Sequence, residues 1–133
     1  RSLSSAASDV YKRQLFGRKR HFPGIQSGAP FIRAAAERMA INAPVQGTAA
    51  DIVRISMMEV YKALVDTNGK AKILLQVHDE LVFEVHESIL DETIIKVSKI
   101  MESVLKDKET HGVPIKVDVS VGDNWLELNP WQE

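Results

Sequence analysis

The chain has 133 residues, which is enough for one hydrophobic core but too few for two full domains. Its hydrophobic content of 44% and charged content of 26% are typical of a soluble globular protein, and no apolar run is long enough for a membrane helix. Cysteine is absent, which excludes a disulfide framework and a thiolate zinc site and favours a cytoplasmic setting.

The net charge of −1 conceals a strong asymmetry along the chain. Residues 1–62 carry ten Lys and Arg against four Asp and Glu, whereas residues 63–133 carry seven Lys against fourteen Asp and Glu. All seven arginines lie at or before Arg54. This division predicts a basic half that meets an anion and an acidic half with another task, for which metal binding is one candidate.

The N-terminal third is predicted to contain a tail, a turn with a short strand, and a helix. Residues 1–14 show no clear period and little to bury, so we expect a tail that is disordered or not native to the protein. Residues 15–23 predict a glycine turn followed by a short basic strand. A helix is expected from Pro30 to about Asn42, because Pro44 disfavours its continuation.

A second helix is predicted to begin at Thr48, whose side chain would form a capping box with Asp51. The apolar face of this helix follows helical spacing through Val53, Met57, Val60 and Leu64. Asn68-Gly69 should end it, because both residues tolerate left-handed backbone. A third helix is expected over roughly residues 89–105, and alternation over residues 115–121 predicts a strand with one buried face.

Between the second and third helices, two alternating apolar runs flank a charged break. The alternating residues are Ile73, Leu75 and Val77 before the break and Leu81, Phe83 and Val85 after it. This pattern predicts a β-hairpin with residues 78–80 at its tip. The tip has no glycine and holds adjacent Asp79 and Glu80, whose repulsion a divalent cation would offset. His78 could be a further ligand or a donor to a substrate; a solvated charged turn is the alternative.

The order of these elements predicts an α+β fold. Strands and helices do not alternate as parallel βαβ units would, so we expect an antiparallel sheet, formed by the hairpin and the C-terminal strand, packed with about three helices.

Arg38, Asn42 and Gln46 are spaced four residues apart, so they share one helix face if the helix continues through Pro44. We call these three residues the polar row. Their donors and acceptors could span base-pair edges or reach sugar and phosphate, although a plain polar outer face would look the same. The basic residues 18–20 could contact phosphates or form a solvated surface.

Four segments together resemble one enzyme family. Residues 76–85, QVHDELVFEV, are similar to the third conserved motif of family A DNA polymerases of the bacterial DNA polymerase I type. Residues 36–52 resemble the helical segment that precedes this motif in the family, and residues 15–20 and 119–125 match in order and spacing. The resemblance identifies residues 15–133 as the C-terminal part of a catalytic domain, with an antiparallel palm sheet.

The resemblance implies a DNA-directed DNA polymerase that acts in replication and repair on primer–template DNA and deoxynucleoside triphosphates. Asp79 would be the metal-binding carboxylate of the palm, Glu80 would assist it, and His78 would approach the primer terminus. The minor-groove side of the newest base pair would be lined by Arg38, Asn42 and Gln46. The chemistry would be nucleotidyl transfer with two Mg²⁺ ions, in a monomeric enzyme of the bacterial cytoplasm.

The chain also departs from the family pattern. The second catalytic Asp, on an earlier palm strand, and the helix that grips the triphosphate find no match, so we expect a fragment that is inactive alone. Two alternatives remain open. One is a nucleic-acid-binding fragment without catalysis. The other is a different Mg²⁺-dependent phosphoryl-transfer enzyme, which would need a second carboxylate cluster, with Asp51 and Asp118 as the only nearby candidates.

Overall fold

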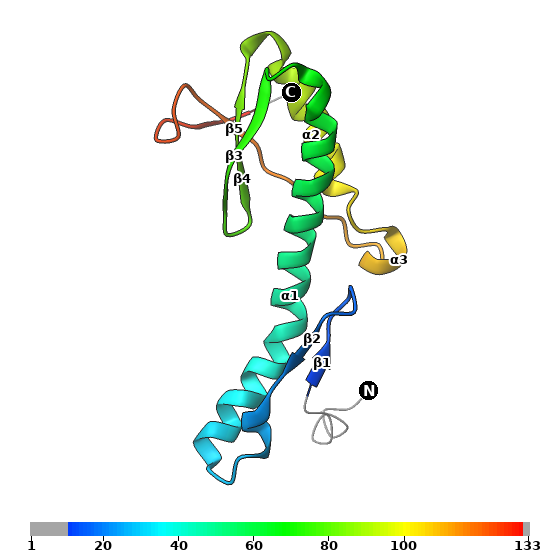
Figure 1. Ribbon diagram of the computed structural model, residues 1–133, viewed down its shortest axis with the longest axis vertical. Helices are drawn as coiled ribbons and strands as arrows, with labels where there is room; N and C mark the ends of the chain where they lie inside the picture. Colours follow the sequence, from blue (N-terminus) through cyan, green and yellow to red (C-terminus); the bar gives the residue numbers. More distant parts are fainter. Residues whose placement is uncertain (1–10, 132–133) are drawn as a thin grey trace. The chain divides into compact units, whose positions relative to one another are not determined.

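The computed structural model describes residues 11–131, with side chains at residues 14–106 and 109–131. The chain divides after Asp51 into two compact units, and each unit is described by itself. Helix α1, Pro30–Leu64, begins in the first unit and ends in the second (Figure 1). Helices and small antiparallel sheets occur together, so the α+β class predicted from the sequence is confirmed. None of the helices in residues 11–131 has the length and apolar character needed to cross a bilayer.

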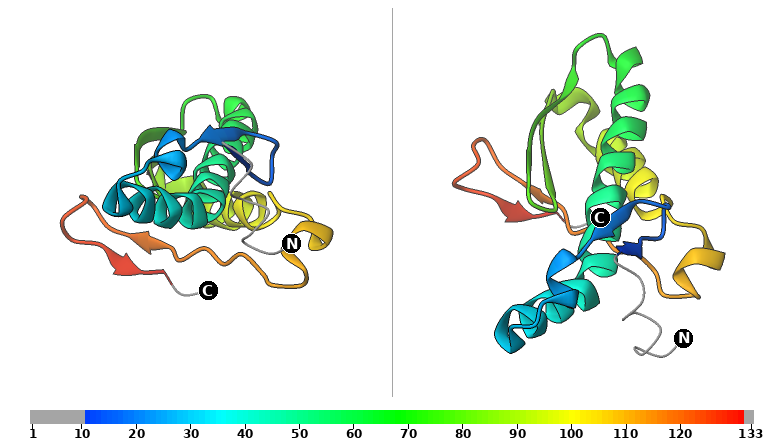
Figure 2. Two further views of the ribbon diagram at one scale, coloured as in Figure 1. Left: turned by 90° about the horizontal axis from the view of Figure 1, so that it is seen from below. Right: turned by 60° about the horizontal axis from the view of Figure 1, so that its bottom comes forward.

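The first unit contains a β-hairpin, which we call the basic hairpin, beside the N-terminal part of α1 (Figure 2). Strand β1, Tyr11–Arg13, pairs antiparallel with β2, Lys19–His21, and the turn between them includes Gly17, as predicted. Residues 11–14 of the expected tail are ordered, because pairing with β2 satisfies backbone groups of β1 and the next residue, Gln14, is buried. Residues 1–10 lie outside the described part of the chain.

The segment that follows the basic hairpin packs against small residues on one face of α1. Phe22 is buried against Ala40 and Ala43, and the short 3-10 helix η2, Pro23–Gln26, contributes the partly buried Ile25 to the same cluster. Alanine side chains let a neighbouring segment approach the helix closely, so this face is closed to solvent without large side chains.

Helix α1 runs through Pro44 without a break, so the predicted division into two helices is wrong. Thr48 is inside the helix and does not cap it: its Oγ1 donates a 2.6 Å hydrogen bond to the carbonyl of Pro44. Asp51 forms an ion pair instead of completing a capping box. Proline disfavours a helix interior through its missing N–H and its ring, and the sequence pattern alone could not show the tertiary contacts on either side of Pro44.

The second unit is built on the C-terminal part of α1. Helix α1 ends at Leu64, and the 3-10 helix η3, Val65–Thr67, continues the helical stretch to Asn68 and Gly69, whose positive φ ends it where the sequence predicted. The core comprises the buried residues Val60, Leu64, Ala71 and Val97, with Ile73, Phe83, Val85, Ile89, Ile100 and Met101 packed against them. Val60 and Leu64 belong to the apolar face predicted for this helix.

Strands β3, Ala71–Val77, and β4, Glu80–Val85, form the predicted hairpin (Figure 1). A bulge interrupts β3, because Ile73 faces Phe83 whereas Leu75 faces Val82, which leaves Leu74 as an extra residue. Side chains alternate along a strand, so the bulge moves the residues after it to the other face. Ile73 packs on the core, whereas Leu75 is 48% exposed.

After the short 3-10 helix η4, Glu87–Ile89, helix α2 spans Leu90–Glu102 and ends earlier than predicted. A four-residue helix, α3, Asp107–Thr110, follows it. Residues 115–121 alternate between partly buried and exposed, as predicted for a strand.

The C-terminal strand does not extend the β3–β4 hairpin within the described residues. Only Ser120–Val121, β5, is paired, and its partner is β6, Asn129–Pro130. In place of the expected continuous sheet, the described residues form three separate two-stranded sheets. The preceding extended stretch contacts α2 instead, where the Val117 N–H donates to Oε1 of Glu102 at 3.3 Å.

Candidate functional site

The β3–β4 hairpin ends in a loop of only two residues. Val77 lies opposite Glu80 in the register, so His78 and Asp79 alone connect the strands, and we call them the tip loop. His78 has a φ of +53°, a left-handed conformation that is uncommon for residues other than glycine. The sequence predicted the position of this turn, and the structure shows that it is tight although it lacks glycine.

The Gln76 side chain supports the tip loop. Its Nε2 donates a 2.6 Å hydrogen bond to the carbonyl of His78, two residues further along the chain. This amide thereby pairs with a backbone acceptor within the two-residue connection. The bond therefore favours the left-handed conformation of His78 that makes the two-residue connection possible.

Asp79 and Glu80 are both exposed at the end of the hairpin, as predicted. Asp79 lies in the loop, whereas Glu80 is the first residue of β4 and lies on the same strand face as Val82 and Glu84. The opposite face of β4 carries Phe83, which packs on the core. The two carboxylates are thus held at the solvent end of a hairpin whose other face is anchored.

The donor set at this tip suits a hard divalent cation. Mg²⁺ is usually bound through one or two carboxylates together with substrate phosphates, so the pair Asp79 and Glu80 fits it in ligand type and number. Among residues 11–131 no group of three or more Asp, Glu or His is placed to hold a metal ion. Any ion held here would therefore need ligands beyond these side chains.

The polar row lies on the part of α1 that belongs to the first unit. Arg38, Asn42 and Gln46 are all exposed, and because α1 continues through Pro44 they share one face. The buried residues of the same stretch, which pack toward Phe22, occupy another face of the helix. The polar row belongs to the first unit and the tip loop to the second, so each is described within its own unit.

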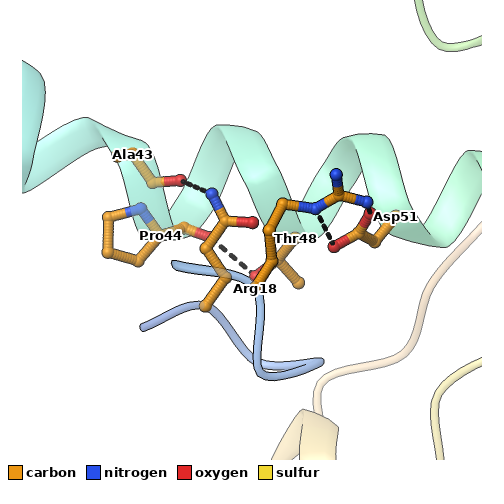
Figure 3. Close-up of polar contacts among 6 residues, drawn as sticks. Arg18, Ala43, Pro44, Thr48 and Asp51 are labelled. Carbon is orange, nitrogen blue, oxygen red and sulfur yellow. Dashed lines mark hydrogen bonds and ion pairs between the residues drawn. The ribbon is translucent and has the colours of Figure 1, made fainter. Parts of the chain in front are cut away.

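Arg18, directly before β2, makes a contact that the sequence did not predict. Nη2 of Arg18 donates to Oδ1 of Asp51 at 2.6 Å, and Nε of Arg18 donates to Oδ2 at 3.3 Å (Figure 3). The hydrogen bond to Asp51 and then its charge raise the pKa of the Arg18 guanidinium. Asp51 is buried, so this arginine neutralises a carboxylate rather than facing solvent with all its donors. The 33-residue separation gives no local spacing signal.

Comparison with known proteins decides the family. The model of DNA polymerase family A matches residues 1–127. The chain belongs to this family. It is 43% identical over 127 residues to the thermostable DNA polymerase I of Thermus filiformis, covering 96% of this chain and 14% of the relative. It is 41% identical over 129 residues to DNA polymerase I of Pseudomonas aeruginosa, covering 97% of this chain and 14% of that protein.

A solved structure is similar as well. The POL domain of Pol1 from M. smegmatis, in complex with DNA primer–template and dNTP, has 42% sequence identity and a TM-score of 0.72, over 77% of this chain and 18% of that one. The resemblance to a bacterial family A polymerase is therefore confirmed, and the chain spans about 14% of the length of the curated relatives named above. The family match begins at residue 1, within residues 1–14, which the sequence predicted to be disordered or not native to the protein.

Proposed function

We propose that this segment belongs to a DNA-directed DNA polymerase that performs template-directed synthesis in DNA replication or repair, as a monomer in the bacterial cytoplasm. The observation that carries the proposal is the tip loop. A chain of family A presents two adjacent carboxylates, Asp79 and Glu80, at an exposed hairpin end.

Asp79 and Glu80 would hold Mg²⁺ at the tip loop, with Asp79 as the principal ligand. When bound, such ions activate the attacking hydroxyl and neutralise charge on the triphosphate and its leaving group. The carboxylates supply anchoring charge, and the short loop restricts where that charge can move. His78, beside Asp79 in the tip loop, would contact the primer terminus through its imidazole.

The polar row would contact the minor groove of the newest base pair. Every correct base pair presents acceptors at similar minor-groove positions, whereas sequence information there is poor. Donors from Arg38, Asn42 and Gln46 could therefore bond to any correct pair and lose their partners at a mismatch. This arrangement checks base-pair shape without reading sequence.

The chain alone would not extend a primer. Two catalytic ions lie about 3.5–4 Å apart and need carboxylates from more than one element to hold them. Among the side chains that the structure describes, no group of three or more His, Asp or Glu could hold a metal ion, so Asp79 and Glu80 supply only one carboxylate pair. Positioning of the triphosphate supplies most of the catalysis in phosphoryl transfer, and one carboxylate pair cannot provide it.

A different Mg²⁺-dependent phosphoryl-transfer enzyme is disfavoured. It would need Asp51 or Asp118 as a second carboxylate site. Asp51 is buried against Arg18, and Asp118 is an exposed residue of the extended stretch before β5. Binding of nucleic acid without catalysis remains the second candidate, favoured by the exposed basic and amide side chains of the polar row.

The test is a chimeric polymerase, in which residues 11–127 replace the matching segment of the Thermus filiformis enzyme. We expect it to extend a primer on a template with Mg²⁺ and to stop when a chelator removes the ion. A chimera that unfolds cooperatively and binds primer–template like the unmodified enzyme, yet adds no nucleotide, would contradict the proposal and favour the binding-only alternative.

A further inference from the structure

Pro44 lies inside α1, between Asn42 and Gln46 of the polar row. A proline in a helix interior donates no hydrogen bond, and its ring crowds the preceding turn, so such helices kink or break there. The three residues of the polar row share one face only if the helix axis continues through this point. Contacts from outside the helix could therefore stabilise the turns on both sides of Pro44.

The segment from Gln14 to Phe22 contacts α1 before Pro44. Phe22 is 3% exposed and packs against Ala40 and Ala43, which are also buried. The side chain of Gln14, itself buried, donates from Nε2 to the carbonyl of Ala43 at 3.3 Å. These contacts attach the segment to the helix turn that immediately precedes the proline.

The same segment contacts α1 after Pro44. Arg18 binds the carboxylate of Asp51 through two hydrogen bonds, seven residues beyond the proline (Figure 3). The Gln14 side chain also lies against Gly47, where an added Cβ would overlap it. Gln14 and Arg18 both lie in the connection between β1 and β2, so one short segment contacts α1 on both sides of Pro44.

We propose that Arg18 is a positioning residue, which with Asp51 holds the basic hairpin across Pro44 and so keeps the polar row aligned for DNA. This inference rests on the proposed function of the polar row. In this role Arg18 acts through α1, as an alternative to the phosphate contact considered for residues 18–20. Its planar guanidinium is suited to this task, because two parallel bonds fix direction as well as distance.

The test uses the chimeric polymerase with four variants: Arg18→Gln, Arg18→Lys, Asp51→Asn and the double variant Arg18→Gln/Asp51→Asn. Primer extension is measured from matched and mismatched termini, and the rates are normalised to the active fraction of enzyme. Arg33→Gln is the matched control. Arg33 is an exposed arginine of α1, and its replacement by Gln removes the same charge as Arg18→Gln. Normalisation removes a simple loss of folded protein, so the ratio of matched to mismatched extension reports alignment.

We expect Arg18→Gln to lower matched kcat/KM about tenfold and to reduce the matched-to-mismatched ratio about fivefold. Arg18→Lys, which keeps the charge but loses the two-bond geometry, should lie between Arg18→Gln and the unmodified chimera. The double variant should lower the ratio by less than the two single variants combined, because Arg18 and Asp51 share one contact. Arg33→Gln should leave the ratio unchanged. If Arg18→Gln fails to fold, the reduced ratio in Arg18→Lys carries the proposal.

Gln46→Ala distinguishes a failure of the positioning role of Arg18 from a failure of the proposed function of the polar row. If Gln46→Ala lowers the ratio while both Arg18 variants leave it unchanged, the positioning role of Arg18 is wrong and the proposed function stands. If Gln46→Ala and Arg38→Ala both leave matched and mismatched extension unchanged, the function of the polar row is wrong. A lower melting temperature for the Arg18 variants with an unchanged ratio would mean that the contact is structural only, and would overturn the inference.

Discussion

Val77 faces Glu80 directly across the end of the β3–β4 hairpin, so the tip loop has two residues and neither is glycine. Such loops need backbone with positive φ, which His78 adopts at +53°. Nε2 of Gln76 donates a 2.6 Å hydrogen bond to the carbonyl of His78. The position of the Asp79 carboxylate therefore depends on a local amide as well as on the strands.

Replacing Gln76 with Met keeps the length of the side chain and removes its donor. We expect the free energy of unfolding of the chain to fall by about 0.5–1.5 kcal/mol, the usual contribution of one hydrogen bond. Urea denaturation measures this change in the free energy of unfolding. Gln26→Met, at an exposed position of η2, is the control and should change stability by less than about 0.5 kcal/mol. An equal effect of the two substitutions would argue against support of the loop by Gln76.

Leu64 should contribute strongly to the stability of the second unit. It is 6% exposed and lies in the core with Val60, so Leu64→Ala should cost about 2–5 kcal/mol through lost contacts and the cavity left behind. Leu126 is 93% exposed, and the same change there should cost less than about 0.5 kcal/mol. Similar denaturation midpoints for the two variants would mean that this core does not hold the unit together.

Gly69 has a φ of +79° directly after the left-handed Asn68. Gly69→Ala places a Cβ in left-handed backbone, so we expect a loss of about 1–2 kcal/mol in the free energy of unfolding. Gly28 has no positive φ and open space around its added Cβ, so Gly28→Ala should leave stability unchanged or raise it by up to about 1 kcal/mol. Thermal denaturation of both variants tests the difference, and a stable Gly69→Ala would rule out the strained turn.

Glu80 should matter less to catalysis than Asp79, since it begins β4 and is held in the ladder opposite Val77. In the chimeric polymerase we expect Glu80→Gln to lower the rate of nucleotide addition about tenfold and to raise the Mg²⁺ concentration needed for half-maximal rate. Glu84→Gln is the matched control and should leave both values unchanged. Glu84 lies on the same strand face as Glu80, and its Oε1 is 3.8 Å from Nζ of Lys72. A Mg²⁺ requirement unaffected by Glu80→Gln would remove Glu80 from the metal site.

Much of the local structure could be predicted from the sequence because it depends on neighbouring residues. Alternation of apolar residues predicted the β3–β4 hairpin, and Asn68-Gly69 predicted the end of α1, since both signals act over a few residues. The exposed tip with Asp79 followed from the same pattern.

The errors arose where distant residues overrule local preference. Pro44 predicts a helix break by itself, and the basic hairpin that contacts both sides of it begins about 30 residues earlier in the chain. The bulge at Leu74 leaves no mark in a sequence that alternates on either side. The partner of Arg18 could not be inferred from spacing, and Asp51 was assigned to a helix cap because a cap is the nearest local role for a carboxylate.

The most direct test of the account is Asp79→Asn in the chimeric polymerase, with single-nucleotide addition and primer–template affinity measured separately. Asn preserves the size of the side chain and removes the charge that would bind a cation. We expect the rate of addition to fall at least about a thousandfold. The Kd for primer–template should change less than about threefold, because DNA affinity comes mainly from backbone contacts elsewhere. Asp66→Asn, an exposed acidic residue of η3, should change neither quantity. If Asp79→Asn instead bound DNA far more weakly but added nucleotides normally at saturating DNA, Asp79 would be a DNA contact and not a metal ligand.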